Sequence, residues 1–408
     1  MSIMNILFFT DNFHPESNAP AIRAYEHSKE WVKQGHSVTI ITSAPNFPEG
    51  KLYPGYKNSW YQKEKIEGID VVRIKTYMTA NEGVVKRTLD YTSFMCASLL
   101  VGLFIKKADV VVATSPQFFC ACSGFAVAKL KRKPFIFELR DFWPESIKAV
   151  GAINKTLIIS FFEKIEQFLY KKSDLIIPVT QSFKKTLIER DIDSNKICVV
   201  RNGVDLEKFY PRDRDSKLEE EFNIKGKTVV GYIGTHGLAH SLITLVQVAE
   251  ILQDRNDIVF MFVGSGAIKK QLLKIVNNKR LENILFIDRQ PHDQIARYWS
   301  MCDLSIIHLR NLSIFKDVIP SKIFESMAMG IPILLGQPKG EATEIINKYD
   351  LGIVISPENK HEMVDAITEL ADDKEKRNAF KINAKQSKKE FDRKLAARKM
   401  LDAIESIM

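Results

Sequence analysis

Hydrophobic positions in this chain form short β-branched runs that alternate with longer amphipathic segments along nearly its whole length. This alternation is typical of parallel sheets covered by helices. In the first half the pattern predicts strands at Asn5–Phe9, Ser37–Thr42, Asp70–Ile74, Asp109–Ala113, Phe135–Glu138, Asp174–Pro178 and Lys196–Val200. A second series follows at Thr228–Ile233, Ile258–Val263, Ile284–Ile287, Leu304–Ile307, Pro332–Leu335 and Gly352–Ile355. We therefore expect two doubly wound α/β domains.

The break between the two series predicts the domain boundaries. Residues 198–212 pass from a predicted strand to Asn-Gly and then to a polar stretch that contains a proline. We place one domain at residues 1–202 and a second at 203–385. Residues 386–408 are helical in pattern and lie beyond the last predicted strand, so they can cross back onto the first domain.

The composition indicates a folded, reduced protein. Hydrophobic residues make up 45% and charged residues 27% of the 408 positions, as in soluble globular proteins. The 5 cysteines include no C-x-x-C pair, which fits a cytoplasmic location. The N-terminal segment has no basic start and reaches Asp11 after a short apolar run, so we expect a buried strand there and no signal peptide.

The positive charge is concentrated in the first half of the chain. Of the net charge of +9, residues 1–200 contribute +7, with clusters at Lys106-Lys107, Lys129–Lys133 and Lys171-Lys172. This excess suits a face near anionic lipid or near a phosphate-bearing acceptor, although solvated helix ends explain it as well. The uncharged segment Tyr91–Ile105 is only 15 residues long, too short to span a membrane.

A glycine-rich turn closes the first strand of the second series. In Gly231-Tyr-Ile-Gly234-Thr-His-Gly237 the glycines let backbone amides approach a diphosphate, with the positive end of the following helix directed at it. The segment does not match G-x-G-x-x-G, and a tight turn without a ligand explains it about as well.

A second cluster lies at Pro320-Ser321-Lys322-Ile-Phe-Glu325. Pro320 and Ser321 suit the start of a helix that can hold phosphate, and Lys322 adds a full positive charge. Ser321 and Glu325 are one helical turn apart, so they can address the phosphate and the ribose of one ligand. The alternative is an ordinary capped amphipathic helix.

Together these motifs resemble the retaining family 4 glycosyltransferases. The resemblance runs in order through Arg201-Asn-Gly-Val-Asp205, the glycine loop, Phe262-Val-Gly-Ser-Gly266 and the Pro320–Pro332 segment, and covers nearly the whole chain. It implies a GT-B fold, with two Rossmann-like domains. The sequences of residues 140–146 and of Pro320-Ser-Lys322 are similar to those of the bacterial surface-polysaccharide branch, which includes N-acetyl-fucosamine transferases.

The resemblance implies that the second domain binds a UDP-sugar and the first an acceptor. Glu325 would then hold the ribose, Asp317 would stand where the family carries a second Glu for the donor sugar, and Arg289 would lie near the base or phosphate. The expected diphosphate-binding residues are Gly237, Ser321 and Lys322. Where relatives place Arg and Lys in the glycine loop, this chain has Thr235, His236 and His240.

The first domain supplies the acceptor and catalytic candidates. The loop from Thr10 to Arg23 follows the first strand, where open α/β sheets place ligands, and His14 and Arg23 are its foremost candidates. Arg140-Asp141 stands where many relatives carry His-Asp. Asp141 can orient the acceptor hydroxyl or stabilise positive charge on the donor sugar, and Arg140 can pair with phosphate. A buried Arg–Asp pair that fixes the turn is the alternative.

We expect no metal and no cofactor. The two D-x-D matches, at Asp191–Asp193 and Asp213–Asp215, lie in a polar turn and in the charged passage between the domains, which suits neither as a metal site. Backbone amides, Lys322 and Arg289 would then meet the charge of the leaving diphosphate.

The resulting hypothesis is a retaining, metal-independent glycosyltransferase. It would move a sugar such as N-acetyl-fucosamine from a UDP-sugar to a polyprenyl-diphosphate-linked saccharide for O-antigen or capsule, at the inner face of the bacterial plasma membrane. Anionic lipid is an expected partner and nucleic acid is not. The alternatives are a UDP-sugar 2-epimerase on the same fold, a nicotinamide-dependent oxidoreductase, for which the G-x-G-x-x-G fingerprint is missing, and a catalytically inactive scaffold.

Overall fold

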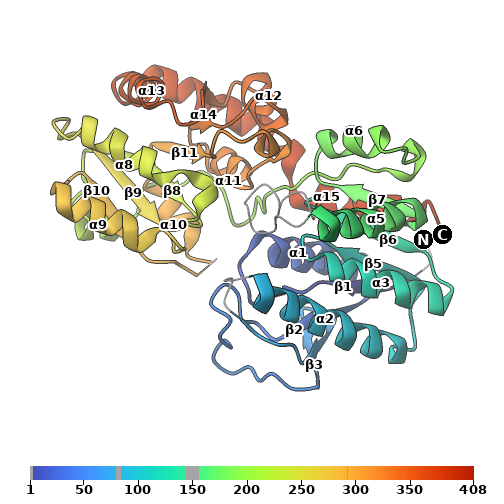
Figure 1. The fold of residues 1–408 in the computed structure, drawn as a ribbon. Coiled ribbons are helices and arrows are strands. Elements are labelled where there is room, and N and C mark those ends of the chain that lie inside the picture. The colour runs from blue at the N-terminus through green and yellow to red at the C-terminus, as the bar shows by residue number, and fades with distance from the viewer. Residues whose placement is uncertain (1–2, 80–83, 143–155, 292) are drawn as a thin grey trace. The chain divides into compact units, whose positions relative to one another are not determined.

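The structure is a computed structural model that describes residues 3–79, 84–142, 156–291 and 293–408. It divides into two compact units (Figure 1). The first runs from the N-terminus to Asn202 and takes up Arg393–Met408, and the second is Gly203–Asp392. Each unit is a Rossmann-like α/β domain, the architecture of a GT-B protein.

The first unit is built on a sheet of seven strands within the described residues, in the order β3-β4-β2-β1-β5-β6-β7. Neighbouring strands are parallel except β3, which is antiparallel to β4. The strands are β1 Asn5–Phe9, β2 Ser37–Ser43, β3 Tyr61–Ile66, β4 Ile69–Ile74, β5 Val110–Thr114, β6 Phe135–Leu139 and β7 Leu175–Pro178.

Helices cover both faces of this sheet. One face packs against α2 (Val84–Phe104), α3 (Phe118–Lys131) and α5 (Thr156–Lys172). The other packs against α1 (Ala19–Lys33) and α15 (Arg393–Glu405), while α6 (Gln181–Glu189) follows β7. No helix of the described residues is both long enough and apolar enough to span a membrane.

The second unit has six parallel strands among its described residues, in the order β10-β9-β8-β11-β12-β13. They are β8 Thr228–Ile233, β9 Ile258–Val263, β10 Ile284–Ile287, β11 Leu304–His308, β12 Ile333–Gly336 and β13 Gly352–Ile355. The helices are α7 Ser216–Glu221, α8 Leu242–Ile251, α9 Lys269–Lys279, α10 Ile295–Ser300, α11 Lys322–Met329, α12 Glu341–Lys348, α13 Lys360–Asp372 and α14 Lys374–Ser387.

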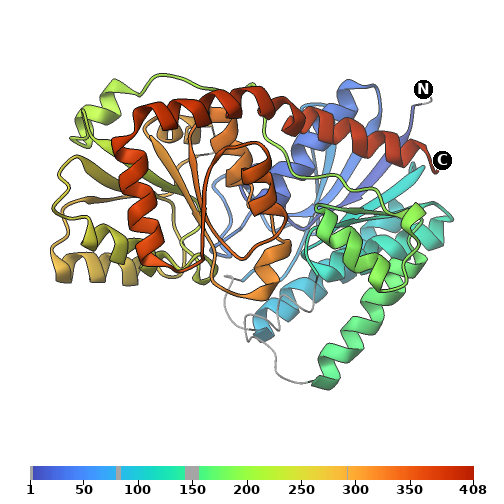
Figure 2. The same ribbon diagram turned by 90° about the horizontal axis from the view of Figure 1, so that it is seen from above.

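The C-terminal helix α15 belongs to the first unit, where it packs along α1 (Figure 2). The indole Nε1 of Trp31 donates to the carbonyl of Ala397 at 2.9 Å. The returning segment begins at Arg393 and not at residue 386, because Phe391 is still buried in the second unit, 5.0 Å from the ring of Phe324.

Both sheets reverse their strand order beside their first strand. In the first unit the reversal lies between β1 and β5, and in the second between β8 and β11. Loops that leave the carboxyl ends of such neighbouring strands diverge and form the crevice in which α/β proteins bind ligands.

Two strand predictions differ from the structure. Tyr61–Ile66 is an edge strand that the sequence pattern missed, because its side chains alternate between exposed and half-buried and show no apolar run. The predicted strand Lys196–Val200 is absent from the described sheet, where Ile197 makes a single bridge to Ile176.

Candidate functional site

The loop after β8 is shaped to receive a lysine side chain. Gly234 has a φ of +145°, and a Cβ on it would lie 2.4 Å from Cε of Lys322. A side chain at position 234 would therefore displace Lys322. The sequence predicted close backbone approach at this glycine, and in the structure the stem of Lys322 occupies that space.

Lys322 is held by Tyr232 at the carboxyl end of the first strand. Its Nζ donates to the Tyr232 hydroxyl at 3.0 Å and lies 4.1 Å from the ring centroid. The hydroxyl in turn donates to the carbonyl of Thr235 at 2.7 Å. Burial lowers the pKa of Lys322 to about 8, although Glu325 acts in the opposite direction. A desolvated cation in this position is stabilised by a bound anion.

The two histidines of the loop are neutral. Burial, with Lys269 and Lys322 nearby, lowers the pKa of His236 to about 4, and burial with Lys322 lowers that of His240 to about 3. His240 and His308 also hold each other. Nδ1 of His240 bonds the carbonyl of His308, and Nδ1 of His308 bonds the carbonyl of His240. Lys322 therefore supplies the positive charge that these histidines do not.

His236 does not take the ligand-facing position that the sequence suggested. Its side chain is fully buried, and its amide donates to the carbonyl of Ser265 at 2.8 Å. Its carbonyl accepts from Ile268 at 3.1 Å. Thr235 is exposed beside it, and Gly237 precedes the short 3₁₀ helix Leu238–His240.

Helix α11 brings three predicted donor residues together. Ser321 is its N-cap and makes no side-chain cap bond, Lys322 opens the helix, and Glu325 lies in its first turn. Glu325 Oε2 accepts a bond of 3.1 Å from the indole Nε1 of the buried Trp299. Asp317 ends the 3₁₀ helix Ser313–Asp317 that precedes α11.

Arg289 is placed farther along the same edge. It is exposed in the loop after β10, which is separated from β8 by β9 in the sheet. The glycine loop, Lys322 and Glu325 thus lie together, whereas Arg289 follows a strand two positions away in the sheet.

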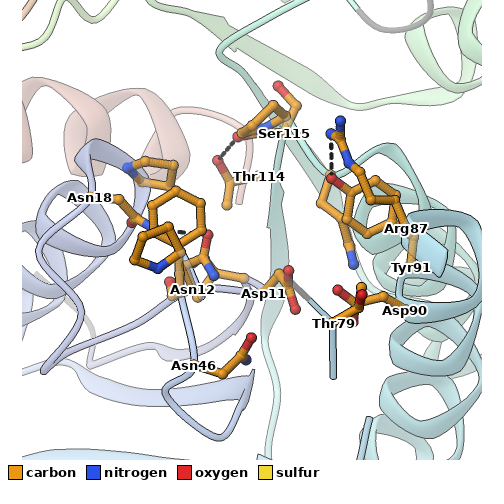
Figure 3. Close-up of a pocket in the computed structure, with 16 residues that line it drawn as sticks. Asp11, Asn12, Asn18, Asn46, Thr79, Arg87, Asp90, Tyr91, Thr114 and Ser115 are labelled. Atoms are coloured by element: carbon orange, nitrogen blue, oxygen red, sulfur yellow. Dashed lines mark hydrogen bonds between the residues drawn. The ribbon is translucent and has the colours of Figure 1, made fainter. Parts of the chain in front are cut away.

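The first unit holds a pocket of about 230 Å³ at the corresponding place in its own sheet (Figure 3). Loops after β1 and β5 form part of its wall, and helix α2 and the segment Asn46–Pro48 complete it. Its described lining consists of Thr10, Asp11, Asn12, Asn18, Pro20, Asn46, Phe47, Pro48, Thr79, Arg87, Asp90, Tyr91, Thr114, Ser115, Pro116 and Gln117.

Two carboxyl groups of this pocket have raised pKa values. Burial and the nearby charges of Asp90 and Glu16 place the pKa of Asp11 well above its usual range. Burial raises the pKa of Asp90 to about 7, against the opposing effect of Arg87. Asp11 lies in the loop that the sequence singled out. Asp90 and Gln117 were missed, because Asp90 lies within helix α2 and Gln117 just before helix α3, and only the fold brings them to the pocket.

The two acceptor candidates named from the sequence lie elsewhere. Arg23 is buried, and its guanidinium donates to Glu138 at 2.7 Å and to the carbonyls of Val200 and Arg201 at 3.0 Å. It therefore fastens the last residues of the first unit to the sheet. His14 stacks on Tyr25 with ring centroids 4.6 Å apart and is outside the pocket lining.

Arg140 and Asp141 follow β6, next to the pocket. Their amides both donate to the hydroxyl of Ser115, at 2.7 and 3.2 Å. Burial lowers the pKa of Arg140 to about 10, offset by Glu138. Glu138 acts on Arg140 as a nearby opposite charge, while Oε1 of Glu138 forms its ion pair with Arg23 at 2.7 Å. Residues 143–146 of this motif lie outside the described residues.

Three of the four D-x-D aspartates have defined structural places. Asp215 caps α7 and pairs with Arg297 at 2.7 Å. Asp193 caps the 3₁₀ helix Ser194–Lys196, and Asp191 occupies a turn with a φ of +59°.

Both halves of the chain match known glycosyltransferase families. Residues 21–208 match the family described as Glycosyltransferase Family 4, and residues 213–387 match Glycosyl transferases group 1. The candidate colanic acid biosynthesis glycosyl transferase WcaI of Escherichia coli K12 is 22% identical over 374 residues, which are 89% of this chain and 91% of WcaI.

A second relative has a lipid-linked substrate in its name. It is the N-acetylgalactosamine-N,N'-diacetylbacillosaminyl-diphospho-undecaprenol 4-alpha-N-acetylgalactosaminyltransferase of Campylobacter jejuni, 25% identical over 61% of this chain and 62% of that protein. Among solved structures, HepE of Anabaena in complex with UDP and glucose superposes with a TM-score of 0.74 at 16% identity, over 99% of this chain and 100% of HepE. That likeness concerns the fold.

Proposed function

Since the chain belongs to the group 1 and family 4 glycosyltransferases, we propose that it transfers a sugar from a UDP-sugar to a polyprenyl-diphosphate-linked saccharide in bacterial surface polysaccharide synthesis. The observation that supports a UDP-sugar donor is the position of Lys322, a desolvated cation beside a glycine turn at the carboxyl end of β8. The C. jejuni relative, whose name includes a diphospho-undecaprenol saccharide, supports the acceptor class, and the E. coli relative, named for colanic acid biosynthesis, supports a role in polysaccharide synthesis.

In this proposal the second unit binds the nucleotide. The diphosphate accepts hydrogen bonds from the loop amides around Gly237 and from Lys322, whose positive charge it stabilises. Glu325, oriented by Trp299, accepts from the ribose hydroxyls. These contacts offset the charge that develops on the departing diphosphate without a metal ion.

We propose transfer with retention of the donor's anomeric configuration. The acceptor hydroxyl attacks the donor carbon on the face from which UDP departs. The C–O bond to the diphosphate breaks as the new glycosidic bond forms, and the acceptor proton passes to the diphosphate oxygen. The transition state carries positive charge on the sugar ring, which Asp141 is suited to stabilise. For the donor sugar we propose an N-acetylated deoxyhexosamine such as N-acetyl-fucosamine.

We further propose that the first unit docks on the cytoplasmic leaflet. Exposed apolar side chains on the helices of one sheet face include Leu100, Leu103, Phe104, Leu130, Phe161 and Phe168. The end of α2 is joined to α3 where Lys131 Nζ donates to the carbonyl of Ile105 at 2.6 Å. Exposed Lys106 and Lys107 flank this apolar surface, a combination that favours anionic lipid.

The test is a panel of UDP-sugars incubated with a synthetic polyprenyl-diphosphate-linked N-acetylhexosamine. We expect one donor to bind in preference and to extend the lipid-linked acceptor by one sugar. Stereochemistry of the new linkage, read by NMR, checks retention. Conversion of the donor to its 2-epimer without acceptor would support the epimerase, and absence of both binding and product across the panel would refute the proposal.

A further inference from the structure

We infer that the pocket between β1 and β5 binds the terminal ring of the acceptor as an uncharged saccharide, read by Asp11, Asp90 and Gln117, and rejects acidic sugars. This inference rests on the proposed transferase function and specifies the chemistry of its acceptor.

The size and lining of the pocket fit a single sugar ring. Its volume of about 230 Å³ is below the range of sites for drug-sized molecules, which is roughly 300–1,000 Å³. Phe47, Tyr91 and three prolines give it flat apolar surfaces on which the C–H face of a pyranose can pack, while the remaining lining residues are polar.

The carboxyl groups favour a ligand that donates hydrogen bonds. Figure 3 shows Asp11 at the centre of the pocket, between Asn12 and Asn18 on one side and Asp90, Arg87 and Tyr91 on the other. A carboxyl group accepts hydrogen bonds through its oxygens and also donates one when it is protonated, so sugar hydroxyls match both groups in either state. Burial is the largest cause of the raised pKa of both Asp11 and Asp90, so the carboxylate of a uronic acid placed beside them would lose its hydration in the same way, and its charge would be disfavoured.

Arg87 only partly offsets the preference of the pocket for uncharged sugars over anionic ones. It is the cationic residue of the described lining, and its Nη2 donates to the Tyr91 hydroxyl at 2.9 Å. Behind the wall, Glu16 adds a further acid whose Oε1 accepts the amides of Asn46 and Phe47 at 2.8 Å. Burial raises the pKa of Glu16 as well.

Gln117 supplies independent evidence for a ligand. It lines the pocket with 6% of its surface exposed, and neither its amide oxygen nor its nitrogen has a hydrogen-bond partner among the described residues. An unpaired buried amide is costly, and native proteins rarely leave one without a partner. A sugar hydroxyl or an N-acetyl group can both donate to and accept from this side chain.

The experiment is ligand-observed saturation-transfer NMR with the full chain. The probes are methyl N-acetyl-β-D-glucosaminide, methyl α-D-galactoside and methyl β-D-glucuronide. We expect saturation transfer to at least one neutral glycoside and none to the glucuronide. In Asp11→Asn, Asp90→Asn and Gln117→Leu we expect the neutral signal to fall at least fivefold. Asp70→Asn, which changes an exposed carboxylate on β4 of the same unit, should leave it unchanged.

Three outcomes would overturn the inference: no signal from either neutral glycoside, equal signals in the pocket variants and Asp70→Asn, or a glucuronide signal as strong as the neutral ones. Melting curves identify any variant that fails to fold, and three separate substitutions keep the comparison decisive. UDP-sugar binding is measured in the same samples. Donor binding without glycoside binding refutes the pocket assignment alone, whereas loss of both donor binding and transfer refutes the proposed function.

Discussion

The indole Nε1 of Trp299 donates to Oε2 of Glu325 across 3.1 Å, linking α10 to the first turn of α11. Trp299 is fully buried, so its indole is fixed by the core of the second unit. The bond therefore orients the Glu325 carboxylate without any ligand. This orientation reduces the side-chain entropy that donor binding would otherwise cost.

We predict that Glu325→Ala weakens UDP-sugar binding by about 1–3 kcal/mol, the range for a hydrogen bond to a charged group. Isothermal titration with UDP and with the preferred UDP-sugar measures the loss. Trp299→Phe is the matched control for orientation, because it keeps the carboxylate and removes its donor, and its effect should be smaller. Unchanged affinity in a folded Glu325→Ala protein would exclude the ribose contact.

Lys322 gives the donor site a predicted pH dependence. Its pKa of about 8 in the folded protein lies below that of a free lysine, so it loses its proton as the pH rises through 8. The groups that face it do not titrate there: burial lowers the pKa of His236 and His240 to about 4 and 3 and raises that of Tyr232 well above 10. UDP affinity should therefore decline above about pH 8.

Lys322→Arg tests whether deprotonation of Lys322 causes the loss of UDP affinity above pH 8. Arginine keeps its charge there, so the affinity of this variant should change less with pH. Lys322→Met should bind weakly at every pH. The same shift has a stability consequence with a definite sign. The unfolded chain binds more protons than the folded one between about pH 8 and the free-lysine value, so the unliganded protein gains stability over that interval. A wild-type affinity that stays constant from pH 7 to 10 would contradict the assignment.

Strands could be predicted from the sequence where helices cover both faces of the sheet. Asn5–Phe9 and Thr228–Ile233 have the predicted bounds, since parallel strands covered on both faces read as continuous apolar runs. Tyr61–Ile66 lacks such a run because it is an edge strand, and its pairing depends on β4. The end of the second unit also escaped prediction, since Phe391 packs there only through tertiary contact.

The candidate site was predictable only where its residues are close in the chain. Ser321, Lys322 and Glu325 share the start of one helix, so spacing placed them together. The hydrogen bond from Lys322 to Tyr232 spans 90 positions and forms only in the folded domain. Arg23 looked like a ligand residue in a polar loop, but it is buried against Glu138, a contact across 115 positions that no local pattern reveals.

Metal independence is a further prediction. Asp215, in the D-x-D match of the second unit, caps α7 and pairs with Arg297 at 2.7 Å. Transfer should therefore continue in excess EDTA at a rate within about twofold of the untreated enzyme, as electrostatic stabilisation rests on amides and Lys322. Loss of activity in EDTA that Mg²⁺ or Mn²⁺ restores would show that a cation takes part.

Membrane docking makes a prediction for the apolar surface of the first unit. The protein should sediment with vesicles of phosphatidylcholine and phosphatidylglycerol, and less so as salt increases. Lys106→Glu with Lys107→Glu should weaken binding, since each basic residue near an anionic surface contributes about 1 kcal/mol. Phe104→Ser, at an 80% exposed position, should weaken it at high salt too, whereas Ile382→Ser, exposed in the second unit, should not.

The last prediction concerns Asp141, whose amide and that of Arg140 are anchored on Ser115 Oγ beside the sugar pocket. This anchoring holds the backbone at the start of the turn, so a substitution that removes only the charge of Asp141 can be tested on a backbone that Ser115 already fixes. Asp141→Asn keeps the shape and removes the charge. If the carboxylate orients the acceptor or stabilises the sugar cation, transfer should slow by about 10²-fold or more, with UDP-sugar affinity and melting temperature nearly unchanged. Ser115→Ala separates position from charge, because it releases both amides but keeps the carboxylate charge, and its rate loss should be smaller. Turnover near wild type in Asp141→Asn, or unfolding of that variant, would assign Asp141 to structure and leave the developing charge to other groups.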